Sequence, residues 1–170
     1  IIFALQSGKG DLGVAGMTNT PERAQTVDFS INYVDTNQMI IVPEGSDITG
    51  PEGLAGKTIG VQESTTGDIV ASDYEEQGST IERYSKGNDA IQALKQGKVD
   101  CVIIDNEPAK AYVAANEGLT ILETPWVEED YAIGMKKGNT ALLEAVNAAM
   151  TELKADGTFQ AIVDRYITAD

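Results

Sequence analysis

Side chains suited to binding a small charged molecule occur at three points, each where an apolar run of the sequence ends. Thr18 and Arg23 follow DLGVAG, Thr65 and Thr66 follow KTIGVQ, and Asp105 closes CVIID. An arginine binds a carboxylate through two parallel hydrogen bonds, a carboxylate pairs with an ammonium group, and hydroxyls orient either one. Together the three sets predict a site for a zwitterion such as an α-amino acid.

The first set lies in GMTNTPERAQTVDFS, at residues 16–30. A threonine followed by proline is typical of a helix start, with Thr20 as the N-cap. In the functional interpretation, the amide groups after Thr20, the Thr18 hydroxyl and the Arg23 guanidinium converge on a carboxylate. In the structural alternative, the segment is only a helix N-terminus and Arg23 is an exposed residue that pairs with a neighbouring carboxylate. The sequence leaves both open.

The second and third sets have the same two interpretations. The stretch QESTTGD at 62–68 lies between a predicted strand and a predicted helix, and its glycine would allow close approach of the backbone to a ligand. Asp105 would lie at the carboxyl edge of a parallel sheet, where α/β folds bind ligands. The alternative for both is helix capping. The candidate ligand-binding residues of the second set are Gln62, Thr65, Thr66 and Gly67.

Composition excludes several classes of function. The chain has 170 residues, of which 42% are hydrophobic, so it can bury a core. With 12 Lys and Arg against 27 Asp and Glu, the net charge is -15, which argues against nucleic acid and anionic membranes as partners. Histidine is absent, which removes histidine bases and the commonest zinc ligand, and we expect neither a metal nor a cofactor. The single cysteine, Cys101, cannot form an internal disulfide.

Hydrophobic periodicity predicts strands that alternate with helices, which indicates βαβ units and a parallel sheet. The helix over 88–98 would be capped by Asn88 or Asp89. The strands are expected at 11–16, 37–45, 57–62, 79–85, 99–105, 119–123 and 130–138. The helices are expected at 1–9, 20–27, 64–78, 88–98, 107–118, 139–157 and 158–167.

Four separated motifs also resemble a known family. ALQSGKGDLGVAGMTNTPERAQTVDFS, LAGKTIGVQESTTGD, VDCVIIDNEPAKAY and YAIGMKKGN occur in this order over nearly the whole chain. They resemble the family 3 extracellular solute-binding proteins of amino-acid ABC transporters. The resemblance implies the α/β periplasmic-binding-protein type II fold, in which two lobes joined by two crossing strands close over an amino acid. The first lobe would comprise 1–32 and 132–170, the second would be 38–126, and the crossings would lie near 33–37 and 127–131.

The same resemblance assigns roles to the candidate residues. It implies that Arg23 binds the α-carboxylate of the ligand and that Asp105 binds its α-ammonium group. Ser64 replaces the glycine that the family often has in a GTTG turn. The remaining contacts would come from Gly16 and Thr18 in the first lobe and from Thr65, Thr66 and Gly67 in the second.

The beginning of the chain leads us to expect a fragment. IIFALQSG has no initiator methionine and has the pattern of a helix without an N-cap. The resemblance implies that the first lobe lacks a strand, a helix and a second strand, together about 40 to 60 residues. The second lobe would be complete. The missing part would carry the residues that contact the ligand side chain. We therefore expect the fragment to bind amino acids weakly or not at all and to self-associate, through exchange of its C-terminal helices across 127–131.

The function expected is capture of an L-amino acid and its delivery to an ABC transporter permease, without enzymatic turnover. The protein would act in the periplasm or on the extracellular face of the membrane, with a lipid anchor in the full-length protein left open. One alternative is a cyclohexadienyl-type dehydratase on the same fold, for which Asp105 and Glu63 are the carboxyl groups near the expected pocket. Another is the ligand-sensing domain of a receptor.

Overall fold

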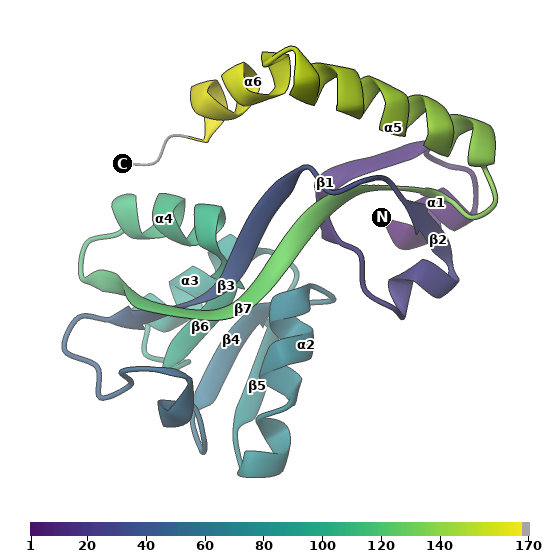
Figure 1. The fold of residues 1–170 in the computed structure, drawn as a ribbon. Helices are drawn as coiled ribbons and strands as arrows, with labels where there is room; N and C mark the ends of the chain where they lie inside the picture. The colour runs from purple at the N-terminus through teal and green to yellow at the C-terminus, as the bar shows by residue number, and fades with distance from the viewer. Residues whose placement is uncertain (168–170) are drawn as a thin grey trace. The chain divides into compact units, whose positions relative to one another are not determined.

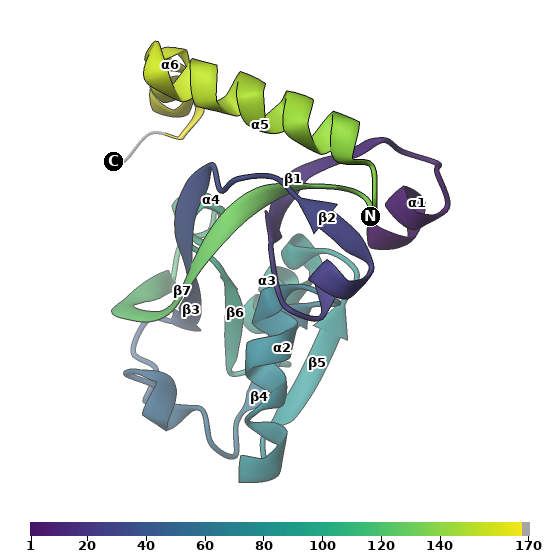
Figure 2. The same ribbon diagram turned by 45° about the vertical axis from the view of Figure 1, so that its right-hand side comes forward.

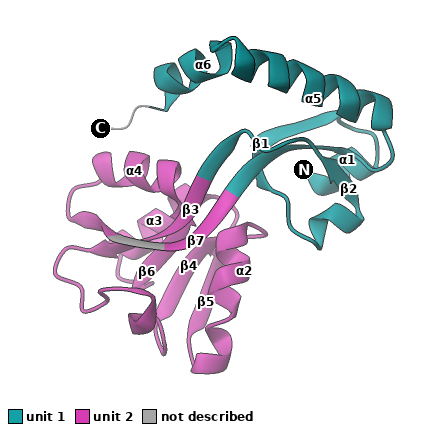
Figure 3. Cartoon of the chain, in the orientation of Figure 1, with its two compact units in different colours: residues 1–35, 130–170 teal, residues 36–129 magenta. Residues whose placement is uncertain are grey.

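A computed structural model describes residues 1–167 of the chain, without the side chains of 123–125. It divides into two compact units (Figure 3). Unit 1 comprises Ile1–Asp35 and Asp130–Asp170, and unit 2 comprises Thr36–Glu129. Both divisions fall within strands, β3 (Val34–Pro43) and β7 (Leu119–Lys136), so each of these strands continues from one unit into the other.

Unit 2 is built on strands in the order β3, β6 (Cys101–Asp105), β4 (Thr58–Gln62) and β5 (Thr80–Tyr84). β4 is parallel to β5 and β6, as expected for βαβ units, but β3 is antiparallel to β6. The prediction of a purely parallel sheet is therefore wrong at β3. The connection from β3 to β4 holds only the one-turn helix η2 (Pro51–Gly53), so no crossover helix forces β3 to run parallel to the others.

Apolar residues cover both faces of this sheet, because successive side chains of a strand point to opposite sides. Met39 and Ile41 of β3 pack on one face with α3 (Gly87–Lys95) and α4 (Asn106–Ala114). Ile40 and Val42 pack on the other face with α2 (Thr66–Ser72). Figures 1 and 2 show α2 and α3 on opposite sides of these strands. The polar ends of the strands are thus held by two packed cores.

The three α-helices in the described part of unit 2 begin or end at other residues than predicted, and α4 already ends at Ala114 instead of at 118. The cap of α3 is neither Asn88 nor Asp89: the helix starts at Gly87 after Lys86, with no side-chain capping bond. Gly87 packs tightly there, since a Cβ on it would lie 2.9 Å from Ile104 Cδ1. α2 ends at Ser72, and the rest of the predicted helix is the short η3 turn (Glu75–Gln77).

Unit 1 contains three antiparallel strands and three helices among its described residues. β1 (Leu12–Thr18) and β2 (Val27–Phe29) both pair with β7. α1 (Ile2–Gln6) precedes β1, while α5 (Thr140–Ala155) and α6 (Thr158–Tyr166) follow β7. The core of the unit contains Ile133, Met135 and Met150, with side chains of α5 and α6 packed against them.

Several sequence predictions for unit 1 are wrong. The apolar run DLGVAG at 11–16 predicts a buried strand, but β1 exposes Leu12 by 42% and Val14 by 64%. The predicted strands 119–123 and 130–138 belong to one strand of 18 residues. Instead of a helix over 20–27, the chain forms the single 3-10 turn η1 (Arg23–Gln25) and then β2. Pairing of β2 with β7 supplies the backbone hydrogen bonds that a helix would otherwise provide.

Candidate functional site

Gly16 is placed by a change of register in β1. The pairing with β7 shifts between Gly13 and Met17, and Gly16 has a left-handed φ of 57° within this irregular stretch. Its N–H donates to Tyr33 Oη at 3.2 Å, and a Cβ on it would lie 3.1 Å from the ring of Tyr131. Both the backbone conformation and the packing therefore require glycine here.

The guanidinium of Arg23 is held next to the end of β1. Its Nη1 donates to the carbonyl oxygen of Thr18 at 3.0 Å, and its backbone N–H donates to Thr20 Oγ1 at 3.2 Å. The prediction of Thr20 as the N-cap of an α-helix is wrong, because η1 has only three residues and its N-cap position is Glu22, although Thr20 Oγ1 accepts the Arg23 N–H. The predicted row of helix N-terminal donors is absent, and the structure brings Arg23 and Thr18 together through the guanidinium.

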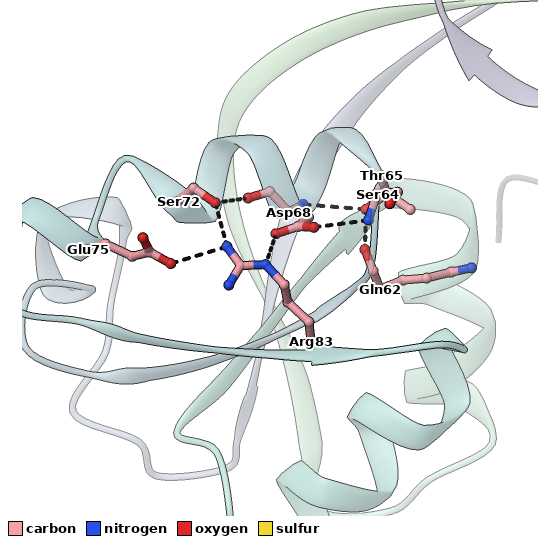
Figure 4. Close-up of polar contacts among 7 residues, drawn as sticks. All are labelled: Gln62, Ser64, Thr65, Asp68, Ser72, Glu75 and Arg83. Atoms are coloured by element: carbon pink, nitrogen blue, oxygen red, sulfur yellow. Dashed lines mark hydrogen bonds and ion pairs between the residues drawn. The ribbon is translucent and has the colours of Figure 1, made fainter. Parts of the chain in front are cut away.

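The turn between β4 and α2 in unit 2 is organised by capping bonds (Figure 4). Thr65 Oγ1 donates to the Gln62 carbonyl oxygen at 2.8 Å and accepts from the Asp68 N–H at 3.3 Å. Asp68 Oδ2 in turn accepts from the Ser64 N–H at 2.9 Å. This is a variant of the capping box, so the helix-cap alternative holds for the Thr65 hydroxyl in this structure.

Thr66 and Asp105 meet in a polar network centred on Gln38, a fully buried residue of β3. Gln38 Nε2 donates to Thr66 Oγ1 at 3.1 Å, to Asp105 Oδ1, and to Glu129 Oε2 at 3.4 Å. Thr66 Oγ1 also donates to Glu129 Oε2 at 2.8 Å. Residues from four elements of unit 2 therefore converge at the carboxyl end of β6.

The position of Asp105 distinguishes it from a helix cap. It occupies the N-cap position of α4, yet its side chain makes no capping hydrogen bond. Antiparallel register places it opposite Gln38, to which its carboxylate bonds. The structural alternative to a ligand-binding role, a capping carboxylate, is thus not what the structure shows.

Gly67 is fixed by packing. A Cβ there would lie 2.9 Å from Gln38 Oε1 and 3.1 Å from the carbonyl oxygen of Ile103. The first turn of α2 can approach β6 and the buried amide only because this position carries no side chain. The close approach foreseen from the sequence therefore exists, but towards the protein's own groups.

Sequence reasoning missed Gln38 and Glu129. A buried glutamine directly before the apolar run MIIV was a usable signal, because a polar side chain in a buried strand needs partners. In the described part of the chain, Gln38 Oε1 and Thr36 Oγ1 are buried without a hydrogen-bond partner. Glu129 lies in an acidic stretch, VEED, that gave no such signal.

Two searches of the described residues bear on other classes of site. None of their His, Cys, Asp and Glu side chains forms a group of three or more that could hold a metal ion. Among the helices of residues 1–167, we find none with the length and apolarity to cross a membrane.

Burial raises the pKa of the Cys101 thiol to about 12.

Comparison with known proteins defines the class. Residues 1–169 match the bacterial extracellular solute-binding proteins, family 3. The chain belongs to this family. With the ABC transporter glutamine-binding protein GlnH of Bacillus subtilis it shares 32% identity over 168 residues, which cover 98% of this chain and 61% of GlnH. The chain therefore spans less than two thirds of that relative's length.

Solved structures agree with this family. An ancestral arginine-binding protein bound to arginine superimposes with a TM-score of 0.93 and 41% identity, over 97% of this chain and 75% of that protein. A more distant kind of relative is also similar: the membrane-bound lytic murein transglycosylase F of Desulfosudis oleivorans is 30% identical over 174 residues, 99% of this chain and 38% of the enzyme.

Proposed function

We propose that this chain contributes to a protein that captures an L-amino acid outside the cytoplasm and delivers it to an ABC transporter permease. The observation that carries the proposal is Asp105, a carboxylate at the end of a core strand that leaves its own helix uncapped and bonds to a buried amide. Such a group suits the ammonium of a ligand. Membership of the family and the names of the relatives, which refer to glutamine and arginine, support the same function.

In this proposal the two units correspond to the two lobes of the periplasmic-binding-protein type II fold. Unit 1 would bind the α-carboxylate through Arg23, with Gly16 and Thr18 beside it. Unit 2 would bind the α-ammonium through Asp105. Further contacts would come from Gln62, Thr65, Thr66 and Gly67, where Thr66 already shares Gln38 with Asp105.

The proposed function is binding without turnover. Asp105 accepts a hydrogen bond from Gln38, and a carboxylate at this position suits the ammonium group of a bound amino acid. The relatives named as glutamine- and arginine-binding proteins support this role over the dehydratase and receptor alternatives.

Calorimetric titration with L-arginine and L-glutamine tests the proposal. In the full-length protein we expect heat of binding from at least one of them, without chemical change of the amino acid. Arg23→Ala should weaken that binding at least tenfold, because a charge-assisted hydrogen bond contributes about 1.5 to 3 kcal/mol. Arg23→Lys should restore little, since lysine cannot form the two parallel bonds. Arg165→Ala, which removes an exposed arginine of α6, is the matched control.

Asp105→Asn separates binding from folding. Asparagine keeps the shape of the side chain and removes its charge, so the melting temperature should change little while the affinity drops. Unchanged affinity in both Arg23→Ala and Asp105→Asn would show that the ligand binds elsewhere. A large fall in melting temperature with full affinity would assign Asp105 a purely structural role.

A further inference from the structure

Arg83 of β5 reaches across to α2 and its C-terminal extension (Figure 4). Its Nε donates to Asp68 Oδ1 at 2.7 Å, and its Nη2 donates to Ser72 Oγ at 2.8 Å and to Glu75 Oε1 at 3.1 Å. The Asp68 carboxylate is mostly buried, with 13% of its side chain exposed, and Arg83 is 37% exposed. The strongest part of this contact is therefore the partly shielded bond between Arg83 and Asp68.

Asp68 uses its second carboxylate oxygen on the turn that precedes the helix. Asp68 Oδ2 accepts from the Ser64 N–H at 2.9 Å, while its own N–H donates to Thr65 Oγ1. The Asp68 carboxylate thus joins Arg83 on one side to the Ser64 N–H on the other, while the backbone N–H of Asp68 binds Thr65. β5 also holds the start of the turn, because the Glu63 N–H donates to the Tyr84 carbonyl oxygen at 2.8 Å.

Ser64 is held in a conformation that needs such support. Its φ is 64°, and in the described part of the chain every other residue with a positive φ is a glycine. The left-handed conformation is costly for a residue with a Cβ, so a serine stays there only when its surroundings fix it. Here the bond from its backbone N–H to Asp68 Oδ2 holds this conformation.

We propose that Arg83, acting through Asp68, is a positioning residue that holds the 62–66 turn with Ser64 in the left-handed conformation. The chain of contacts from Arg83 through Asp68 to Ser64, here called the brace, therefore also positions Thr65 and Thr66 to contact a ligand. The effect on ligand binding rests on the proposed function, whereas the effect on the conformation of the turn concerns unit 2 alone. The brace replaces the conformational freedom that a glycine would supply at position 64.

Amide hydrogen exchange of the chain without added amino acid tests the brace directly. Arg83→Met and Asp68→Ala should each accelerate exchange of the Ser64 amide about three- to tenfold, the effect of losing a partly exposed charged hydrogen bond. Two controls separate this from general loosening. Glu75→Gln removes the charge of the other carboxylate on Arg83, and Asp47→Asn weakens the exposed ion pair of unit 2 with Lys57. Both should leave the Ser64 amide near its parent rate.

Titration with L-arginine and L-glutamine tests the consequence for binding. Arg83→Met should weaken whichever amino acid binds the parent by about three- to tenfold. Adding Ser64→Gly to Arg83→Met should restore the affinity to within about twofold, because glycine adopts a positive φ without support. If the Arg83–Asp68 ion pair only stabilised the fold, Ser64→Gly would not restore the affinity for the amino acid.

The outcomes are distinct. An exchange rate of the Ser64 amide that is the same in the parent and in Arg83→Met would overturn the brace. A loss of affinity in Arg83→Met that persists after Ser64→Gly is added would overturn it as well. If neither amino acid binds the full-length parent protein, the proposed function is what fails, and the exchange rates still decide whether Arg83 holds the turn.

Discussion

Replacing Gly67 by alanine tests the packing at the centre of unit 2. The added Cβ would lie 2.9 Å from Gln38 Oε1, 3.1 Å from the Ile103 carbonyl oxygen and 3.5 Å from Ile103 Cγ2. The first contact is with a side chain that is fully buried and anchored through its amide nitrogen, and the second is with the backbone of a central strand. Neither neighbour can move aside easily, so the first turn of α2 must shift.

Two opposing effects set the size of the change. Alanine favours a helix over glycine by about 1 kcal/mol, partly because it restricts the unfolded chain. Overpacking of a filled core costs about 1 to 3 kcal/mol. Because two of the contacts are shorter than ordinary van der Waals distance, we expect an overpacking cost in the upper part of this range, about 2 to 3 kcal/mol, and hence a net loss of about 1 to 2 kcal/mol.

Urea unfolding followed by tryptophan fluorescence measures this loss. Trp126 is the single tryptophan of the chain and packs against Tyr74 in unit 2, with ring centroids 5.9 Å apart. Its signal therefore reports on the unit that contains Gly67. With a slope of about 2 kcal/mol per molar urea, the middle of the usual range, the midpoint should fall by roughly 0.5 to 1 M.

Gly53→Ala is the control for this measurement. Gly53 lies in the same unit, and a Cβ there would meet nothing nearer than 3.4 Å, so the variant should be neutral or slightly more stable. If Gly67→Ala kept the parent's midpoint and lost only amino-acid affinity, the steric reasoning would be wrong, and the glycine would be needed for the ligand rather than for packing.

Three further results are expected. The hydrogen bond from Lys137 lowers the pKa of Asp28, so this ion pair should stabilise the fold by up to about 1 kcal/mol at pH 7. The contribution should be lost as the pH falls below about 4, where the carboxylate becomes protonated. In urea unfolding, Asp28→Asn should therefore be less stable than the parent at pH 7 and equally stable in acid. Since burial raises the pKa of Cys101 to about 12, a thiol reagent at pH 8 should modify it only after denaturant is added, and rapid modification of native protein would contradict its burial. Exposed apolar side chains on the terminal strand β1 should make the chain self-associate, so light scattering should rise with concentration and fall in Val14→Lys; a monomer at every concentration would refute this.

Local sequence signals located the central strands of unit 2. β4 and β6 lie within the predicted ranges because their apolar runs are bounded by polar residues, and α2 starts after Thr65 in the stretch for which helix capping was the alternative. The signals failed where pairing partners are distant. The segment TPERAQTV has the composition of a helix start, yet its last residue begins a strand that pairs with residues more than 100 positions later. A local window contains no information about such a partner.

The candidate site shows the same limit. Arg23, Thr66 and Asp105 could be chosen from the sequence because charged and hydroxyl groups after apolar runs are conspicuous. The residue that joins Thr66 to Asp105 could not, because Gln38 is 28 and 67 positions away from them and becomes central only when β3 pairs antiparallel with β6. The role of Ser64 was likewise hidden until its φ angle and its bond to Asp68 were known.

The division of the chain also determines the order in which the parts of the two units are synthesised. Unit 2 is one uninterrupted segment, whereas the two halves of unit 1 are separated by all of it. On a ribosome that adds about 5 to 20 residues per second, β1 would emerge roughly 5 to 20 s before the part of β7 with which it pairs. During that interval unit 2 can fold, while the nascent β1 segment has an apolar surface and no sheet to join. A chaperone that recognises short extended apolar segments would find its binding site there, and only for as long as translation of the insert takes.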